Sequence, residues 1–431
     1  MIIKKARQFQ GELYLPGDKS ISHRAAILAA ISEQTVNIRN FNQGKDCLST
    51  LDCLLQLGIP VKIQNSRITI QGKGLRGFHN PEQPLNAGNS GTTMRLLSGL
   101  LAGQQFSSII TGDESLNKRP MKRIIHPLKR MGAKIHSAPE YTAPLQIVGT
   151  ELSGISHKLQ VASAQVKSCI ILAGLLASTK TNIIEPVQTR NHTELMLNLT
   201  VEKSSEGNTI LVEPGTVPHF VKTYNIPGDI SNAAYLIAGA LICKDGTALL
   251  RNVGINPTRA GVLDVLESMG AEFTIRNSSC LMGEDIADIQ IHQSRLRGIS
   301  IGGDIIPNVI DEIPILAVIG SVAEGSFSVR DAAELRVKEC DRITAIVRNL
   351  RNMGTAIEEH NDGFTIYGGN KLKGTDIKTY GDHRIAMAFT IAGLVAEGET
   401  VIDNPGAADI SFPKFRQVIE NFTNKQVENE R

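Results

Sequence analysis

Six segments of the chain are apolar on every side when they are drawn as helices, and turn-forming or polar residues open each of them. Their starts lie about 70 residues apart. Short strands with alternating apolar and polar residues follow them, as in residues 34–41, 181–186 and 246–253. This spacing predicts a sixfold internal repeat. The six segments begin at Asp18, Asn89, Ser163, Asp229, Asp311 and Asp382.

A helix that is apolar all round belongs in an interior, whereas an alternating strand can leave one face in water. We therefore expect buried helices and outer sheets. A second, amphipathic helix follows the strand in most repeats, and then come two paired strands, so each unit is predicted to be βαβαββ. In four repeats this second helix ends at an expected C-cap glycine, namely Gly58, Gly132, Gly270 and Gly354. The third repeat lacks that glycine, and the sixth is cut short at the C-terminus.

The length of 431 residues suits two domains of three repeats each. The pattern breaks at Pro227 and Gly228, which places the expected change of domain there. The formal charge of +2 and the low aromatic content of 4% argue against a nucleic-acid surface. The N-terminus lacks the apolar run of a signal peptide, and no apolar stretch reaches membrane-spanning length. The six cysteines form no CxxC pair, which favours reduced thiols in a cytoplasmic protein.

Cationic and hydroxyl side chains gather where the predicted helices start. Helix N-termini carry unpaired N–H groups and the positive end of the helix dipole, so cations are unfavourable there unless an anion is bound. The repeated pattern predicts a cleft for small polyanions such as phosphates and carboxylates. The residues concerned are Lys19, Ser20, Arg24, Asn89, Gly91, Thr92, Arg95, Lys118, Arg119, Ser163, Gln165, Lys167, Arg190, His192, Lys338, Arg342 and Arg384.

The same positions also permit simpler interpretations. A single Lys or Arg in a first helical turn is usually solvated, and Asp229 and Asp382 are best explained as N-caps. Glu339, next to Lys338, could form a plain ion pair or could move protons. The remaining candidates are weaker: His23 and His383 could be buried and satisfied or act directly, and Cys340 is assigned to packing because no base accompanies it.

Two motif searches are negative. The GxGxxG match that starts at Gly72 is not followed by a helix and is interpreted as a chance match in a hairpin. The sequence contains no P-loop and no spaced His or Cys cluster. We therefore expect no nucleotide cofactor and no metal.

Nine ordered segments resemble the motifs of the 5-enolpyruvylshikimate-3-phosphate synthase family. They are PGDKSISHR, GNSGTTMR, NKRPMKR, SAQVKS, EPVQTRNHTE, IDEIPILA, LRVKECDRI, GDHRIAMAF and SFPKF. The resemblance covers nearly the whole chain, and the combination is far more specific than any single motif.

The resemblance implies a two-domain inside-out α/β barrel with six βαβαββ repeats. It places residues 1–18 and 227–431 in a C-terminal domain and residues 19–226 in an N-terminal domain, with hinge crossovers near 18–19 and 224–229. The implied reaction transfers the enolpyruvyl group of phosphoenolpyruvate to the 5-hydroxyl of shikimate 3-phosphate and releases phosphate. The resemblance implies neither cofactor nor metal, no nucleic acid and no membrane, and a cytoplasmic monomer that is a target of glyphosate.

The resemblance also implies roles for individual residues. Lys19, Asp311 and Glu339 would be catalytic. The residues that would hold phosphoenolpyruvate are Lys19, Gly91, Thr92, Arg119, Gln165, Arg342 and Arg384. Those that would hold shikimate 3-phosphate are Lys19, Ser20, Arg24, Ser163, Gln165, Arg190, Asp311 and Lys338.

Some positions depart from the best-known branch of the family. Ile410 replaces a lysine that often contacts phosphoenolpyruvate, and Leu96 replaces a proline. The related enzyme that acts on UDP-N-acetylglucosamine is disfavoured, because Ser20 follows Lys19 where that enzyme has Asn, and residues 117–123 contain no cysteine. A non-catalytic anion-binding protein is also disfavoured, since it would gain nothing from the carboxylates Asp311 and Glu339.

Overall fold

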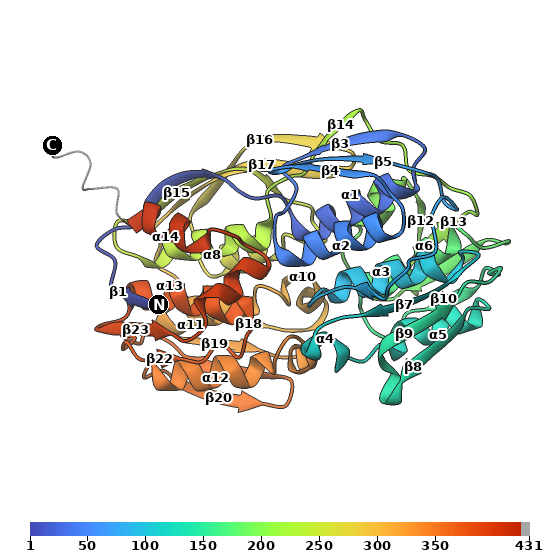
Figure 1. Cartoon of the computed structure of the whole chain (residues 1–431). Helices are drawn as coiled ribbons and strands as arrows, with labels where there is room; N and C mark the ends of the chain where they lie inside the picture. The colour runs from blue at the N-terminus through green and yellow to red at the C-terminus, as the bar shows by residue number, and fades with distance from the viewer. Residues whose placement is uncertain (424–431) are drawn as a thin grey trace. The chain divides into compact units, whose positions relative to one another are not determined.

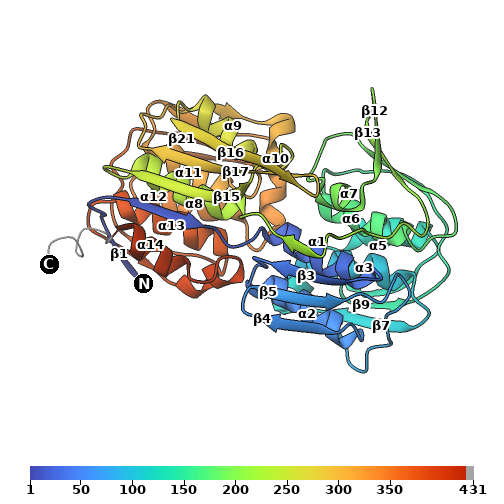
Figure 2. The same cartoon turned by 90° about the horizontal axis from the view of Figure 1, so that it is seen from above.

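The protein, described here by a computed structural model that covers residues 1–423, divides by its contacts into two compact units. The N-terminal unit comprises Gly17–Ile226 together with Met282–Glu284. The C-terminal unit comprises Met1–Pro16, Pro227–Leu281 and residues 285–423. Each unit is a set of sheets arranged around helices (Figures 1 and 2).

The six apolar segments form the central helices, as predicted. In α8 and α13 every residue except the last is buried, which is the result expected for a helix without a polar face. The side chains of Asp229 and Asp382 accept hydrogen bonds from Ser231 N and Arg384 N, so the N-cap interpretation is confirmed for both. The central helices are α1 (Lys19–Ile31), α3 (Gly91–Ala102) and α6 (Ala164–Gly174) in the N-terminal unit, and α8 (Ile230–Ile242), α11 (Ile313–Val322) and α13 (His383–Val395) in the C-terminal unit.

A second helix follows in each repeat. The four predicted glycines lie directly beyond four of these helices with positive φ angles, which confirms their C-cap role. In the third repeat Asn198 adopts the left-handed conformation at φ 49°, so asparagine replaces the missing glycine. These helices are α2 (Lys45–Gln56), α5 (Lys122–Arg130), α7 (His192–Leu197), α9 (Gly261–Ser268), α12 (Arg342–Asn352) and α14 (Phe415–Thr423). Short helical segments are α4 (Glu114–Asn117), α10 (Ile306–Val309), η1 (Pro139–Tyr141), η2 (Gly303–Ile305), η3 (Ala333–Val337) and η4 (Pro405–Ile410).

The N-terminal unit has three four-stranded sheets of one design. The first strand in the spatial order is parallel to the second, and the second is antiparallel to the third. The first sheet is β14 (Thr223–Asn225), β3 (Thr35–Arg39), β5 (Arg67–Gln71) and β4 (Val61–Gln64). The second is β6 (Leu85–Asn86), β7 (Ser107–Thr111), β9 (Thr142–Val148) and β8 (Lys134–Ala138). The third is β10 (Ser156–Lys158), β11 (Thr181–Glu185), β13 (Gly207–Val212) and β12 (Thr200–Ser204).

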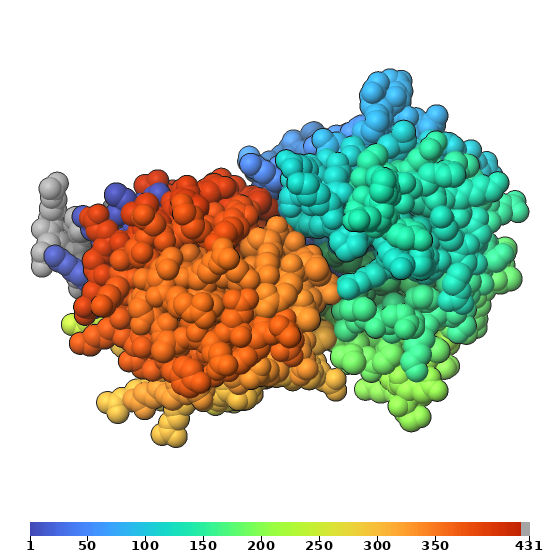
Figure 3. Space-filling model, turned by 90° about the horizontal axis from the view of Figure 1, so that it is seen from below, coloured from blue at the N-terminus to red at the C-terminus, as the bar shows by residue number. Residues whose placement is uncertain are grey.

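The C-terminal unit repeats the design, and Figure 3 shows its surface over α12 and β20 in orange. One sheet is β2 (Gln10–Tyr14), β15 (Thr247–Gly254), β17 (Glu284–His292) and β16 (Phe273–Leu281). The next is β18 (Ser300–Ile301), β19 (Ser326–Val329), β21 (Gly363–Tyr367) and β20 (Ala356–His360). The last has three strands, β22 (Asp376–Ile377), β23 (Glu399–Ile402) and β1 (Ile2–Lys4). The N-terminal strand β1 therefore completes the shortened sixth repeat.

The strands that precede α1 and α8 in the sequence are exchanged. Strand β2 lies directly before α1 but pairs with β15, whereas β14 lies before α8 but pairs with β3. A chain read strictly in order would have paired each with the strand that follows its own helix. The exchange places two of the crossings between the units, at residues 16–17 and 226–227, immediately before central helices.

Candidate functional site

In the N-terminal unit, Lys19 is the first residue of α1 and faces α2. Its Nζ lies 2.5 Å from Asp46 Oδ2, and the lysine side chain is 17% exposed. The N-cap Asp18 accepts a hydrogen bond from Ile21 N, which fixes the first turn of α1. Lys19 therefore presents a cation at a helix start with Asp46 as its local counterion.

Ser20 and Arg24 lie one turn apart on another face of α1, which is directed at α6 and α7. Arg190 Nη1 donates to Ser20 Oγ at 3.3 Å, so these two predicted residues lie together. Arg24 is buried, and it donates from Nε to Thr193 Oγ1 at 2.7 Å and from Nη2 to Ser168 Oγ at 2.8 Å. Burial lowers the pKa of Arg24 to about 10, so the guanidinium stays charged at neutral pH.

Two arginines lie beside the start of α3, Arg119 from outside the helix and Arg95 from its second turn. Arg119 Nη2 donates to Asn89 Oδ1 at 2.8 Å, and a Cβ built on Gly91 would lie 2.7 Å from Arg95 Nη1. The φ angle of Gly91 is not positive, so an easier turn does not explain this glycine. Close approach of neighbouring groups to the backbone remains as the explanation.

Gln165 connects the starts of α6 and α3. It accepts from Arg95 Nη1 at 2.6 Å and donates to Thr92 Oγ1 at 2.9 Å. Ser163 is the N-cap of α6 and accepts from Val166 N at 3.4 Å. These contacts bring four of the predicted residues into one group.

Lys167 does not join that group, and its assignment to the anion cleft is wrong. Its side chain is fully buried, and Nζ lies 2.6 Å from both Glu185 Oε1 and Glu194 Oε1. The lysine sits on the side of α6 that faces the interior and forms a structural ion-pair cluster. Its place near a helix start gave no sign of this orientation.

In the C-terminal unit, Asp311 lies just before α11 and meets two arginines. Its Oδ1 is 3.3 Å from Arg342 Nη1, and its Oδ2 is 3.3 Å from Arg384 Nη2. Arg384 Nη1 also donates to the Asp311 carbonyl at 3.0 Å. The arrangement combines a carboxylate acceptor with two cations.

Arg342 is the centre of this second group. Its buried guanidinium lies 2.8 Å from Asp382 Oδ2 through Nε and 2.6 Å from Glu339 Oε2 through Nη2, in addition to Asp311. Burial acts to lower the pKa of Arg342, but Asp382, Glu339 and Asp311 outweigh it and hold the pKa well above its ordinary value. The sequence predicts that Glu339 lies beside Lys338 and Arg342, but it does not predict the contact of Asp382 with Arg342.

Lys338 and Cys340 flank Glu339. Burial lowers the pKa of Lys338, with Asp311 acting in the opposite direction. The Cys340 thiol donates to Asp382 Oδ2 at 3.6 Å, and burial together with Asp382 raises its pKa. A thiol held in its protonated form is a poor nucleophile, in agreement with the packing role expected for Cys340.

Both predicted histidines are buried. His23 Nδ1 lies 2.7 Å from Thr50 Oγ1, and burial, Lys19 and Arg24 hold the pKa of His23 well below 6.5. His383 follows the N-cap Asp382 and is 2% exposed. Burial is therefore confirmed for both side chains.

Sequence analysis missed a buried polar cluster next to Asp311. Arg259 Nη1 lies 3.0 Å from Glu312 Oε2, and Ser231 bonds to both side chains. Glu312 in turn lies 3.7 Å from Arg384 Nη1. Arg259 could have been found, because it precedes α9 just as other candidate cations precede the second helices of their repeats.

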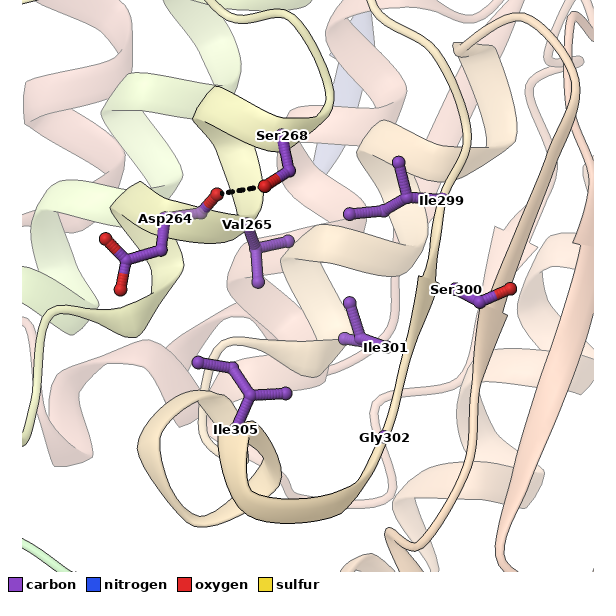
Figure 4. Close-up of a pocket in the computed structure, with 8 residues that line it drawn as sticks. All are labelled: Asp264, Val265, Ser268, Ile299, Ser300, Ile301, Gly302 and Ile305. Atoms are coloured by element: carbon purple, nitrogen blue, oxygen red, sulfur yellow. Dashed lines mark hydrogen bonds between the residues drawn. The ribbon is translucent and has the colours of Figure 1, made fainter.

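A surface hollow of about 380 Å³ lies elsewhere in the C-terminal unit, beside α9 (Figure 4). Its lining mixes polar and apolar side chains. Ser268 Oγ donates to the Asp264 carbonyl at 2.8 Å, and the Asp264 carboxylate points away from the isoleucines. None of the predicted site residues lines it. We therefore do not assign it to the functional site.

Two further properties concern residues 1–423. No group of three or more His, Cys, Asp or Glu side chains in this range is arranged to hold a metal ion. No single helix of this range has the length and hydropathy needed to cross a membrane; Gly303–Val309 and Ile313–Val322 reach them only together, as a pair bent by 108°.

Comparisons with known proteins agree along the whole chain. The profile of the family described as EPSP synthase (3-phosphoshikimate 1-carboxyvinyltransferase) matches residues 3–419. The 3-phosphoshikimate 1-carboxyvinyltransferase of Thermoanaerobacter sp. (strain X514) is 46% identical over 419 residues, which cover 97% of this chain and 99% of the relative. That of Brevibacillus brevis is 47% identical over 420 residues, with 97% and 98% covered.

Solved structures agree with the fold. The EPSP synthase from Acinetobacter baumannii superposes with a TM-score of 0.86 at 41% identity, covering 98% of this chain and 97% of that structure. The enolpyruvyl transferase NikO from Streptomyces tendae has a TM-score of 0.77 at 16% identity, with 98% and 96% covered. The second likeness concerns the fold alone, and together they establish the inside-out α/β architecture.

Proposed function

The chain belongs to the EPSP synthase family, and we infer from this that it transfers the enolpyruvyl group of phosphoenolpyruvate to the 5-hydroxyl of shikimate 3-phosphate. Phosphate is the second product, and the reaction is a step of aromatic amino acid biosynthesis. The observation that carries this conclusion is the match of residues 3–419 to the family.

We propose that phosphoenolpyruvate is held by cations and backbone N–H groups at these helix starts. The start of α3 supports this, because Gly91 leaves the backbone open and the dipole favours a phosphate there. Planar guanidinium groups suit carboxylate and phosphate oxygens. The proposed contacts are Lys19, Gly91, Thr92, Arg119, Gln165, Arg342 and Arg384.

Shikimate 3-phosphate is assigned to a second, overlapping set. Ser20 and Arg190 already share a hydrogen bond, so one phosphate group could engage both. Asp311 is assigned to the reacting hydroxyl because its carboxylate is only partly buried and can accept a proton. The proposed contacts are Lys19, Ser20, Arg24, Ser163, Gln165, Arg190, Asp311 and Lys338.

The proposed chemistry is an addition followed by an elimination. Protonation of the methylene carbon, by Glu339 or Lys19, makes the neighbouring carbon electrophilic, and the 5-hydroxyl oxygen attacks it while Asp311 accepts the hydroxyl proton. The tetrahedral intermediate then loses a methyl proton and expels phosphate, which restores the double bond. Cations fixed before the reaction stabilise the departing phosphate.

Arg342 supports this assignment through its charge balance. Three carboxylates surround its guanidinium, and Arg384 and Lys338 offset the remaining negative charge, so the group has no cation in excess before an anion arrives. An incoming anion would therefore bind more readily as one of these carboxylates takes up a proton. Glu339 is the most exposed of the three, at 20%, and is the natural carrier of that proton.

Two units joined by two short connections suggest a hinge. We propose that the domains are residues 1–18 with 227–431 and residues 19–226, with hinges near 18–19 and 224–229. The enzyme is proposed to work as a monomer in the cytoplasm, where buried free thiols such as Cys47 and Cys169 stay reduced. Light scattering of the purified chain would measure the mass of the particle.

A phosphate-release assay tests the proposed function. Phosphate should appear when phosphoenolpyruvate and shikimate 3-phosphate are both present, and not with either substrate alone. Release with UDP-N-acetylglucosamine instead would support the related transferase. Binding of both substrates without release would support a non-catalytic binding protein.

A further inference from the structure

A chain of hydrogen bonds crosses three helices behind the proposed site in the N-terminal unit. His23 Nδ1 on α1 lies 2.7 Å from Thr50 Oγ1 on α2, and Thr50 Oγ1 lies 2.6 Å from Thr93 Oγ1 on α3. Thr93 Oγ1 then donates to Ser90 Oγ at 2.7 Å. All four side chains have no exposed surface. The chain therefore runs through the interior from α1 to the N-cap of α3.

This hydrogen-bond chain lies one helical turn beyond the Lys19–Asp46 ion pair in the sequence direction. His23 follows Lys19 by one turn on α1, and Thr50 follows Asp46 by one turn on α2, so both contacts join the same faces of the two helices. Thr93 Oγ1 also lies 3.4 Å from the carbonyl of Asp46. The position of Lys19 and the start of α3 are thus tied to one set of contacts.

The donors can be ordered along the chain. The distances alone do not fix the donors of the first two bonds. If Thr93 gives its one hydrogen to Ser90, it accepts from Thr50, and Thr50 then accepts from an Nδ1–H of His23. Ser90 in turn accepts from Thr93 N at 3.1 Å and caps α3. Burial and the neighbouring Lys19 and Arg24 lower the pKa of His23, which keeps the imidazole neutral. A neutral imidazole has one N–H, and this order places it on Nδ1.

We propose that His23 is a positioning residue that, through Thr50 and Thr93, fixes the start of α3 against α1 and so sets how Gly91 and Thr92 meet phosphoenolpyruvate. This inference rests on the proposed function. The start of α3 is also held from outside the helix, because Arg119 Nη2 donates to Asn89 Oδ1 at 2.8 Å. Small displacements of the backbone N–H groups would therefore alter their contact with a bound phosphate.

Polar side chains stabilise this part of the interior less than apolar side chains of similar size would. Buried hydroxyl and imidazole groups gain little net stability over apolar side chains of similar size, since they give up their contacts with water. Hydrogen bonds, however, fix the direction and distance of their partners, which apolar contacts do not. A chain that ends on the N-cap of α3 orients that helix start, and this is what distinguishes it from ordinary packing.

Four variants of the full chain test the inference. His23→Leu and Thr50→Val each break the chain, and His23→Asn keeps a donor at the position of Nδ1. The matched control is Thr390→Val, which removes a buried hydroxyl that donates to the Ala386 carbonyl at 2.8 Å in the other unit. Steady-state kinetics by phosphate release give kcat and the KM of each substrate, and thermal unfolding reports stability.

We expect the KM for phosphoenolpyruvate to rise roughly three- to tenfold in His23→Leu and Thr50→Val, with kcat and the KM for shikimate 3-phosphate changed less than twofold. His23→Asn should restore the wild-type KM, and the double variant His23→Leu/Thr50→Val should show no further rise. Thr390→Val should change none of the kinetic constants.

Lower thermal stability with an unchanged KM would overturn the inference and leave His23 a purely structural residue. Equal changes in both Michaelis constants, or no rescue by asparagine, would also overturn it. If the wild type releases no phosphate, the proposed function fails instead. The hydrogen-bond chain is then tested by nitrogen-15 NMR of the histidine rings. A hydrogen on Nδ1 of His23 is expected, and a hydrogen on Nε2 would refute the proposed donor order.

Discussion

Replacing Glu339 by glutamine separates its two possible roles. Glu339 Oε2 accepts from Arg342 Nη2 at 2.6 Å, and glutamine keeps an oxygen that can accept the same bond. Arg342 also keeps Asp382 at 2.8 Å and Asp311 at 3.3 Å. The variant therefore removes one negative charge and one titratable group while it preserves most of the geometry.

The structure sets the size of each effect. Exchange of a charge-assisted hydrogen bond for a neutral one at a side chain that is mostly buried costs about 1 kcal/mol of folding free energy. The KM for phosphoenolpyruvate should stay the same or fall, because less negative charge surrounds Arg342. Turnover, by contrast, should fall by roughly a hundredfold or more if Glu339 moves the proton.

Three measurements on the same preparation decide the matter. Phosphate release gives turnover, calorimetry gives the affinity for shikimate 3-phosphate, and thermal unfolding gives stability. Glu359→Gln is the matched control, because Glu359 Oε1 accepts from Arg336 Nη1 and Nη2 at 3.1 Å outside the proposed site. It should lose similar stability without losing turnover. A Glu339→Gln variant that loses affinity but keeps its rate at saturation would refute proton transfer by this residue.

Three further predictions follow from buried or crowded groups. Gly91→Ala places a methyl group 2.7 Å from Arg95 Nη1. Because glyphosate is longer than phosphoenolpyruvate, we expect the inhibition constant of glyphosate to rise more than the KM for phosphoenolpyruvate. Equal rises of the two constants in kinetic assays would contradict this. Lys167→Met leaves two buried carboxylates without their counterion and should lower the free energy of unfolding by about 3–5 kcal/mol in denaturant titrations. Lys180→Met, which removes an exposed ion pair, should lower it far less. The folded state holds the pKa of His23 well below 6.5, whereas the histidine of the unfolded chain protonates near pH 6.5. The free energy of unfolding should therefore fall as the pH drops below 6.5. In His23→Asn this dependence of the free energy of unfolding on pH should be smaller by up to about 1.4 kcal/mol per pH unit, measured from unfolding curves.

The central helices were predictable because the residues of a helix show by themselves whether it has a polar face. A segment such as α8 has no polar face, so no other part of the chain is needed to place it in an interior. Caps are equally local, and Asp229, Asp382 and the four glycines took their expected places for that reason. Asn198 was missed only because asparagine is the less common residue at a left-handed position.

Strand partners were not predictable from local patterns. Alternation of apolar and polar residues shows that β2 and β14 are strands, but the pattern suits any available edge. Their exchange, and the use of β1 to complete the sixth repeat, follow from which edges the assembled sheets leave open.

The candidate site also contains some features that local patterns predict and others that only packing decides. Spacing along the repeat located the helix starts, and the side chains of Lys19, Gln165 and Arg384 lie there. Which side of a helix start a cation faces depends on neighbours that are distant in sequence, so Lys167 turned out to be buried between two glutamates. Glu339 is a sequence neighbour of Arg342, but Asp311 and Asp382 come from distant segments and reach Arg342 only when the helices pack.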